Sequence, residues 1–221
     1  MAQGVGRRAR ASKHIVGIVD EAQTSGVLLL AKKRSALTHV QDQFRSRDTG
    51  KIYAALVLGH WPAKLKVIDV ALHKTLDARG ERHVLPVAAD HPDGRRSISL
   101  VQVVTNFQDC TLLDVTLKTG RTHQIRVHLQ HEGHPIVGDD KYGDFALNKA
   151  LGRGSVNEPI KGLDRRQLPE GRFARMFLHA RYLRIDHPVT GEPLTLEAPL
   201  PADCAQLLTA LAPLDPASAK A

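Results

Sequence analysis

The stretch GRTHQIRVHLQHEGHPIVGDDKYGD, residues 120–144, directly follows a run in which apolar and polar residues alternate. That alternation, over residues 112–117, predicts a half-buried strand. Residues 124–131 then predict a short amphipathic helix, which Thr122 is placed to cap and Gly133 to end. The stretch therefore indicates a strand, a turn and a helix in direct succession.

The rest of the chain indicates strands more often than helices. Residues 27–31 predict a buried strand, and apolar residues recur at helical spacing over 35–44. Gly and Pro interrupt residues 144–175 and no periodicity is visible there, so we expect a long loop. The other predictions are strands over 52–58, 67–70 and 97–104, a hairpin of 181–187 with 193–198, and a closing helix around Cys204, Leu207, Leu208 and Leu211.

These elements place the chain in the α+β class, with a mixed, largely antiparallel sheet and flanking helices. A length of 221 residues and a hydrophobic content of 42% suffice for one sizeable core. We expect a basic N-terminal segment over 1–15, a single domain of catalytic size over 16–213 and a short tail over 214–221.

Composition limits the kinds of protein that this chain can be. Its 31 Lys and Arg exceed its 23 Asp and Glu, and the resulting net charge of +8 favours a polyanionic partner. Two cysteines, Cys110 and Cys204, are too few for a disulfide framework or a cysteine-based zinc site, which fits a reducing cytoplasm. No apolar stretch has the length of a membrane span, so we expect a soluble, cytoplasmic protein without a membrane partner.

The positive charge is concentrated in three segments. Residues 1–13 hold four bases and no acid, residues 32–51 hold six bases and two acids, and residues 144–175 hold seven bases and four acids. We therefore expect a localised basic face that follows the phosphates of a nucleic acid. Arg165 and Arg166, adjacent in the third segment, are candidate substrate contacts.

The histidines of the quoted stretch raise the question of a metal site. His128, His131 and His134 are spaced by three, whereas zinc ligands on a helix are normally four residues apart with a third ligand elsewhere. No HExxH motif is present, and Gly133 is expected to end the helix before His134. We therefore expect no metal. A metal-dependent hydrolase and a solvated basic helix remain as alternatives.

A longer pattern bears on this choice. The segment KTGRTHQIRVHLQHEGHPIVGDDKYG, residues 118–143, resembles the signature of the RluA family of pseudouridine synthases. The resemblance covers about residues 16–212 and is strongest for the RluC-like enzymes, which modify large-subunit ribosomal RNA. Further matching segments follow the family's order: TSGVLLLAKKRSA from Thr24, KIYAALVLG from Lys51 and MFLHARYLRIDHPVTGEPLTLEAPLP from Met176.

The resemblance implies an isomerase that converts uridine in RNA to pseudouridine. This reaction breaks the N1–C1′ bond, turns the base and rejoins it through C5, without a metal, nucleotide or redox cofactor. By resemblance the catalytic carboxylate is Asp20, acting at the ribose as nucleophile or as base. Arg121 is then its ion-pair partner, because a nearby cation keeps a buried carboxylate ionised.

Four further residues are implied to contact the substrate. Tyr53 corresponds to the family's active-site tyrosine, whose ring can stack on uracil, and Leu178 to the apolar wall opposite that ring. Lys51 and Arg126 are additional candidates, with phosphate contact as a rival role for the first and structural pairing for the second.

The chain departs from the family pattern immediately before the carboxylate. Where the family has His-Arg-Leu-Asp, this sequence has Gly17, Ile18, Val19 and Asp20. Ile18 thus replaces the arginine that helps to expel the target nucleotide from its stack, and flipping has an energetic cost that this arginine would offset. The sequence before this point is also short for the family. An alternative function is therefore an RNA-binding protein on a catalytically impaired synthase fold.

Overall fold

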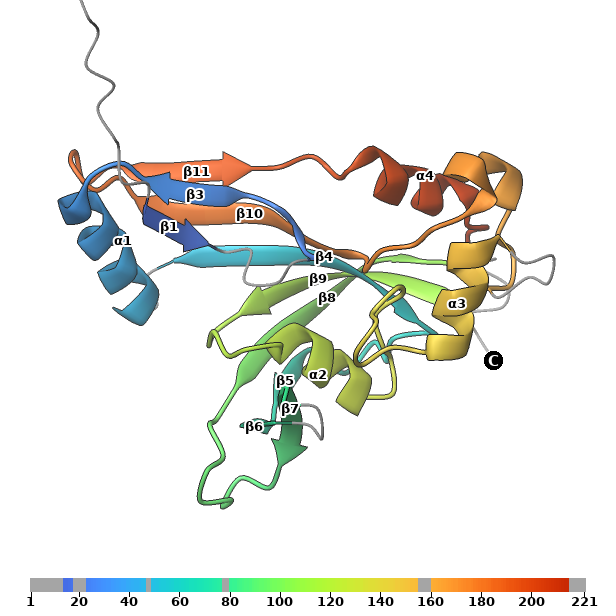
Figure 1. Ribbon diagram of the computed structural model, residues 1–221, viewed down its shortest axis with the longest axis horizontal. Coiled ribbons are helices and arrows are strands. Elements are labelled where there is room, and N and C mark those ends of the chain that lie inside the picture. Colours follow the sequence, from blue (N-terminus) through green and yellow to red (C-terminus); the bar gives the residue numbers. More distant parts are fainter. Residues whose placement is uncertain (1–13, 18–22, 47–48, 77–79, 155–159, 215–221) are drawn as a thin grey trace, which may run out of the picture.

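The computed structural model describes residues 14–17, 23–46, 49–76, 80–154 and 160–214. Strands and helices alternate irregularly along it, as Figure 1 shows, which confirms the α+β class. The elements are β1 His14–Gly17, β2 Ser25–Gly26, β3 Leu28–Ala31, α1 Arg34–Ser46, β4 Gly50–Leu58, β5 Val67–Asp69, β6 Ala71–Leu76, β7 Arg82–Val87, β8 Ile98–Asn106, β9 Cys110–Leu117, α2 Gln124–His131, α3 Phe145–Arg153, β10 Leu178–Asp186, β11 Pro193–Glu197 and α4 Ala202–Ala210.

One sheet organises the described chain. Its strands lie in the order β11, β10, β4, β9, β8 and β5, and β2 pairs with β10 beside this path. All neighbours along the path are antiparallel, whereas β2 runs parallel to β10. The predicted mixed, largely antiparallel sheet is therefore confirmed. Two separate antiparallel ribbons, β1 with β3 and β6 with β7, adjoin the sheet.

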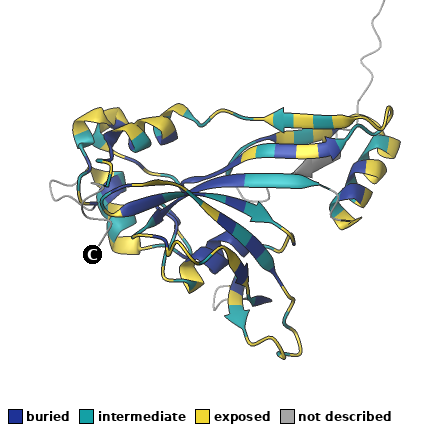
Figure 2. Cartoon of the chain, turned by 180° about the vertical axis from the view of Figure 1, so that it is seen from behind, coloured by how far each residue is buried: buried dark blue, intermediate teal, exposed yellow. Residues whose placement is uncertain are grey.

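The core lies where the central strands converge. Residues 53–57 of β4 are all buried, as expected for a strand covered on both faces. In β9, Leu113 and Val115 are fully buried while Asp114 and Thr116 are partly exposed, as the alternation predicts. Figure 2 shows the buried residues gathered on these strands and on α2. Buried central strands thus form the base on which Tyr53 stands.

The two ribbons differ from the sequence predictions. The strand predicted over 27–31 is present as β3, but Leu28 is 52% exposed and Leu30 is 45% exposed, so its predicted burial is wrong. Among the described strands β3 pairs only with β1, so it has no hydrogen-bonded neighbour in the main sheet. The β6–β7 hairpin is not predicted at all, because polar residues interrupt the alternation of both strands.

The long loop expected over 144–175 is wrong in its first part. Here the chain forms α3, which begins after Asp144, whose carboxylate accepts a backbone N–H three residues on at 2.9 Å. The helix ends at Gly154, whose φ of 64° favours glycine. Both capping signals are visible in the sequence, but Leu151 is the one fully buried residue of the helix, so the apolar periodicity is weak.

Helix α2 has the predicted bounds but not the predicted surroundings. Residues 124–129 are all buried, and the helix packs against β8 and the β6–β7 hairpin. The expectation of an amphipathic helix and the alternative of a solvated basic helix are therefore both wrong for α2. Its N-cap is His123, in the left-handed conformation with φ 52° and without a side-chain cap, so the predicted capping by Thr122 is wrong. A buried α2 brings its polar side chains into the interior.

Candidate active site

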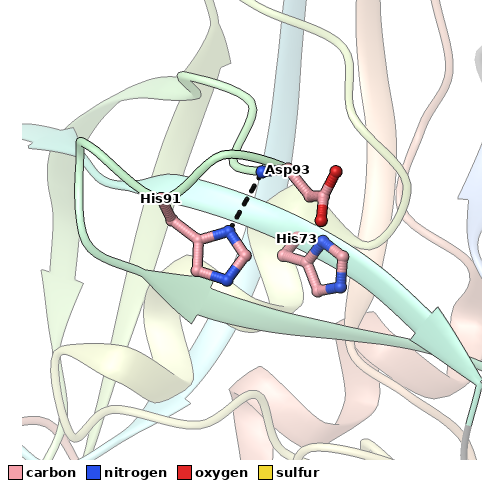
Figure 3. Close-up of side chains that lie close together, drawn as sticks. All are labelled: His73, His91 and Asp93. Carbon is pink, nitrogen blue, oxygen red and sulfur yellow. Dashed lines mark hydrogen bonds between the residues drawn. The ribbon is translucent and has the colours of Figure 1, made fainter.

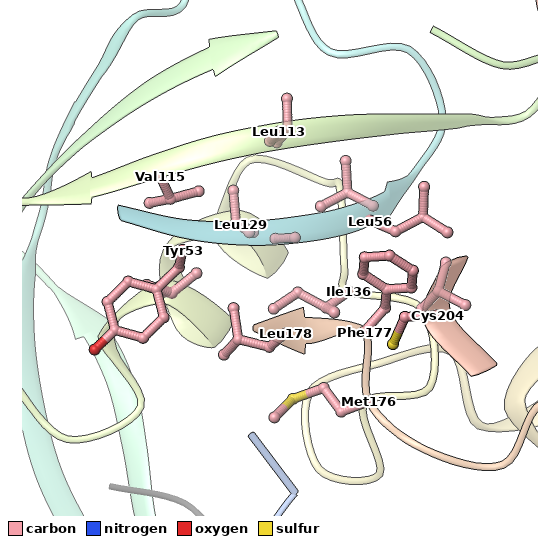
Figure 4. Packing of buried hydrophobic residues seen from close by; sticks show 14 of the residues in the cluster. Tyr53, Leu56, Leu113, Val115, Leu129, Ile136, Met176, Phe177, Leu178 and Cys204 are labelled. Carbon is pink, nitrogen blue, oxygen red and sulfur yellow. The ribbon is translucent and has the colours of Figure 1, made fainter. Parts of the chain in front are cut away.

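Two side chains of the predicted site meet on one face of the sheet. Tyr53 of β4 pairs with Ala180 of β10, and Leu178 pairs with Ala55. Because residues two apart on a strand face the same side, Tyr53 and Leu178 are diagonal neighbours across β4 and β10. They are 7% and 4% exposed. Figure 4 shows both side chains on the same side of β4, next to the apolar core.

Ser25 and Gly26, five and six residues after Asp20, pair with β10. β2 runs along β10 with Gly26 opposite Ala180, and Ala180 in turn pairs with Tyr53. A Cβ added at Gly26 would lie 2.2 Å from the Ala180 carbonyl oxygen, and φ at Gly26 is 126°. Only glycine permits this close approach. The backbone at Gly26 thus fixes the Thr-Ser-Gly segment against β10, with Ala180 between Gly26 and Tyr53.

Side-chain hydrogen bonds fix this segment further. The His179 ring donates from Nε2 to the Ala198 carbonyl oxygen at 3.0 Å, so its Nδ1 accepts the Ser25 hydroxyl at 2.9 Å. Gln23 donates its side-chain amide to Asp140 at 2.6 Å. Asp20 and Ile18 themselves lie outside the described residues. The predicted contact between Asp20 and Arg121 therefore stays a prediction.

Gln124 shapes the turn that carries Arg121. Its amide oxygen accepts the Arg121 backbone N–H at 3.1 Å and the Thr119 hydroxyl at 2.7 Å. Its amide nitrogen donates to the Ile98 carbonyl oxygen and to the Ser99 hydroxyl oxygen, both at 3.0 Å. Gln124 is 2% exposed, so these bonds satisfy its donors and acceptor in the interior. Sequence reasoning missed this residue, although it stands inside the motif.

Lys51 connects this turn with β4. It stands two residues before Tyr53 on the same face, with its Nζ 4.5 Å from the centre of the Phe44 ring. A Cβ added at Gly120 would lie 4.0 Å from this Nζ, so the Lys51 ammonium ends beside the residue that precedes Arg121. Burial lowers the pKa of Lys51. The fold thus brings the Arg121 turn to the end of β4 that carries Lys51 and Tyr53.

Arg126 is engaged in a buried ion pair. Its guanidinium donates to both carboxylate oxygens of Asp139, at 2.6 and 2.8 Å, and to Asp140 at 3.2 Å. The side chains of Arg126 and Asp139 are 7% and 1% exposed. Asp139 also accepts the backbone N–H groups of Lys141 and Tyr142. This placement favours structural pairing over substrate contact for Arg126, with a partner that sequence reasoning had not named.

Replacing Arg126 by Met is expected to destabilise the fold by about 3–5 kcal/mol, because the Asp139 charge would stay buried without its partner. Urea unfolding of both proteins measures the difference. Arg166→Met is the matched control, since the Arg166 side chain is 90% exposed and its pair with Asp164 lies at the surface. Equal unfolding midpoints for the parent and the Arg126 variant would contradict a structural role for this pair.

His128 is a fully buried neutral histidine. Its Nε2 donates to the Val70 carbonyl oxygen at 3.2 Å, and its Nδ1 accepts the Ser99 hydroxyl at 3.0 Å. His134 bonds separately to the Leu58 carbonyl oxygen at 2.8 Å, while His131 is exposed. These histidines of the quoted stretch face different partners and do not converge as metal ligands would. The metal-dependent hydrolase built on them is therefore not supported by the geometry.

His128 should make stability depend on pH. Burial lowers its pKa from 6.5 to about 4, so the fold favours the neutral ring. The stabilisation is complete above pH 6.5 and is lost as the pH falls towards 4, because only the unfolded chain takes up the proton in that range. We expect the unfolding free-energy difference between the parent and His128→Gln to shrink by up to about 3 kcal/mol from pH 7 to 4. A difference that is constant with pH would contradict this assignment.

His123 and Tyr142 connect the site turn with the β6–β7 hairpin. The Tyr142 hydroxyl accepts the Val84 backbone N–H at 3.0 Å and lies 2.8 Å from His123 Nδ1, to which it can donate. Burial lowers the pKa of His123 to about 4, with neighbouring positive charges adding to the effect. The neutral ring therefore accepts this bond throughout the neutral pH range. The hairpin is thereby held next to His123, the N-cap of α2.

The helices of the second and third basic segments lie far apart. α1, within the second basic segment, lies at one end of the long axis, and α3, within the third, lies at the other end (Figure 1). Arg166 is exposed and pairs with Asp164 at 2.8 Å, whereas Arg165 is half-buried and donates to the Ala150 carbonyl oxygen at 3.4 Å. Arg166 is thus the better placed of the two for contact with a nucleic acid. The first basic segment lies outside the described residues.

Comparison with known proteins is consistent with this geometry. The chain is 38% identical over 189 residues to ribosomal large subunit pseudouridine synthase C of Vibrio cholerae, covering 86% of this chain and 52% of that protein. The corresponding Escherichia coli protein is 39% identical over 180 residues, covering 81% of this chain and 50% of that protein. The chain spans about half the length of the curated relatives it matches.

A solved structure shows the same fold. Human RNA pseudouridylate synthase domain containing 1 matches with a TM-score of 0.65 and 26% identity, covering 88% of this chain and 71% of that chain.

No helix in the described ranges is long and apolar enough to cross a membrane. The family model for RNA pseudouridylate synthases matches residues 10–131, more than half of the sequence. The chain therefore belongs to the RNA pseudouridylate synthase family, and within it to the RluA type of pseudouridine synthase.

Proposed function

We propose that this chain is an RNA pseudouridine synthase acting on large-subunit ribosomal RNA, with Asp20 as its catalytic carboxylate. One observation carries the proposal: the segment after Asp20 lies on β10 at Ala180, and the other neighbour of Ala180 is Tyr53. Family membership supplies the class of reaction. The substrate class comes from the relatives, which are named for the large ribosomal subunit.

The reaction needs a carboxylate and no added reactant. The N1–C1′ bond of uridine breaks, the base turns, and a C5–C1′ bond forms; C5 loses a proton and N1 gains one, so that product and substrate are isomers. Asp20 acts at the ribose, as nucleophile or as base. Arg121 keeps that carboxylate ionised by pairing with it. The Gln124 amide holds the backbone of the turn from which Arg121 extends.

Tyr53 and Leu178 enclose the uracil in this proposal. The Tyr53 ring stacks on the base, and the Leu178 side chain forms an apolar wall that keeps water from the reacting atoms. The Lys51 ammonium, partly buried beside the Arg121 turn, is placed to contact a substrate phosphate or carbonyl oxygen. Arg126 supports the site indirectly, by fixing the loop that contains Asp139.

The second candidate function is RNA binding without turnover. Ile18 favours it, because the chain has no arginine at the position that helps to extrude the base. Both functions require RNA affinity, so binding does not separate them. Turnover does, because only a synthase forms pseudouridine.

The direct test incubates the purified chain with transcripts of large-subunit ribosomal RNA and maps pseudouridine by chemical derivatisation and mass spectrometry. Mapping the same RNA from cells with and without the gene product locates the natural site. A synthase gives at least one position that depends on the protein in both experiments. RNA that is bound but never modified would instead support the binding protein.

RNA affinity is expected to fall steeply with salt, because Arg and Lys contacts release counterions from the phosphates. Arg166→Gln should weaken binding to a similar extent for different RNA sequences and lower the slope of log K against log salt by about one. Lys64→Gln is the matched control, an exposed base outside the three basic segments. A slope that is unchanged in the Arg166 variant would exclude this residue from phosphate contact.

A further inference from the structure

His73, His91 and Asp93 form a second group of chemically competent side chains. One possible ligand atom from each lies within 4.8 Å of those of the other two. His73 belongs to β6, while His91 and Asp93 belong to the loop after β7. The two imidazole rings are 5.1 Å apart between centres, and Figure 3 shows the Asp93 carboxylate beside the His73 ring. Two imidazoles and a carboxylate are a common donor set for zinc.

The His91 ring is held in a state that suits metal binding. The Asp93 backbone N–H donates to His91 Nδ1 at 3.2 Å, as drawn in Figure 3. This nitrogen therefore carries a lone pair, and the proton of the neutral ring is on Nε2. A bond of 3.2 Å is long, so a metal ion could displace it at small cost. The same turn that orients His91 also supplies the Asp93 carboxylate.

The backbone fixes the positions from which the three side chains extend. Leu72, next to His73, exchanges two backbone hydrogen bonds with Arg95, at 2.8 and 2.9 Å. The turn is closed by the Gly94 N–H, which donates to the His91 carbonyl oxygen at 2.9 Å. The far end of the loop is thereby joined to β6 at Leu72, and the turn at His91 is closed. In a tetrahedral zinc site the donor atoms lie roughly 3.3 Å apart, so the three donors must move closer than their present separation of up to 4.8 Å.

From this geometry we propose that His73, His91 and Asp93 bind one zinc ion, which fastens the loop after β7 onto β6. Water completes the coordination, since the group offers three ligands and the Asp93 side lies at the surface. The site is structural and takes no part in the proposed isomerisation. It stiffens the hairpin whose Val84 N–H bonds to Tyr142, next to the turn of the candidate active site.

The test titrates zinc chloride into the full chain after treatment with a chelator and desalting. Calorimetry should show one equivalent bound, and the thermal unfolding midpoint should rise with zinc, because an ion that binds only the folded state stabilises it. Magnesium should give neither effect, since it prefers oxygen ligands. The variants His73→Gln, His91→Gln and Asp93→Asn should each weaken binding by at least about 100-fold, more than the loss expected for an outer-sphere change.

Two control variants guard against adventitious binding. Asp90→Asn changes a charge in the same loop, and His39→Gln removes an exposed histidine on α1; both should bind zinc as the parent does. The ligand variants should melt with the parent when metal is absent, since these side chains are not buried. Zinc binding that persists in all three ligand variants, or the absence of a one-equivalent transition in the parent, would overturn the proposal.

Discussion

Replacing Asp20 by Asn is expected to abolish pseudouridine formation while leaving RNA affinity close to that of the parent. The amide has nearly the same shape as the carboxylate but is neither a nucleophile nor a base at neutral pH. Loss of a residue that performs the chemistry typically lowers turnover by at least about 10,000-fold. RNA affinity depends on phosphate contacts from the basic segments, which this change leaves intact. Single-turnover assays and binding titrations of both proteins measure the two effects.

Asp42→Asn on α1 is the matched control, because it makes the same change at an exposed acid. If Asp20→Asn turns over as fast as the parent, Asp20 is not the catalytic carboxylate.

The parent chain is expected to work best on a uridine that is already unstacked, since Ile18 offers no side chain to fill the space left by an extruded base. Ile18→Arg should then improve structured substrates more than open loops. If neither protein modifies any RNA, the binding function is the better description.

The motif from Gly120 predicted α2 to the residue because its signals are local. Gly133, with φ 83°, follows the helix end, as the sequence indicates. The burial of the helix was not predictable in the same way. Gln124 and His128 are polar, and their partners Ser99 and Val70 come from segments far away in the sequence. A polar residue within a helix indicates solvent exposure until its distant partner is known.

For the candidate site too, the sequence predicted which residues take part but not how the fold arranges them. The resemblance named Tyr53 and Leu178, and the structure brings them together, but their adjacency depends on the register between β4 and β10. That register includes a shift after Ala180, which no local pattern reveals. Arg126 illustrates the reverse case: its motif suggested substrate contact, and only the fold shows the buried pair with Asp139.

The hairpin and α3 were missed for a different reason. Their residues carry weak periodicity, because few of them are buried: two in β6 and one in α3. Asp144 and Gly154 mark both ends of α3, and more weight on capping residues would have found it. In β6, the polar residues His73 and Lys74 obscure the alternation. Elements that contribute little to the core leave little pattern in the sequence.

Arg121→Leu is expected to lower turnover at saturating RNA by at least about 100-fold, as a misplaced catalytic group does. Without its cationic partner the catalytic carboxylate should gain a proton more readily, so its pKa should rise. The acid limb of the pH–rate profile would then move to higher pH, because the reactive form is the ionised one. Arg121 is exposed, so the variant should melt with the parent. Unchanged turnover and an unchanged acid limb would remove Arg121 from the mechanism.

The Gln124 network allows a sharper form of this test. Gln124→Met removes the acceptor of the Arg121 backbone N–H, while Ser99→Ala removes one partner of the Gln124 amide nitrogen and leaves that acceptor in place. If Gln124 acts through Arg121, Gln124→Met alone should lower turnover. Added to Arg121→Leu in a double variant, it should cause little further loss. Ser99→Ala should affect stability more than turnover. Losses that add fully in the double variant would show that Gln124 supports the fold and does not position the catalytic turn.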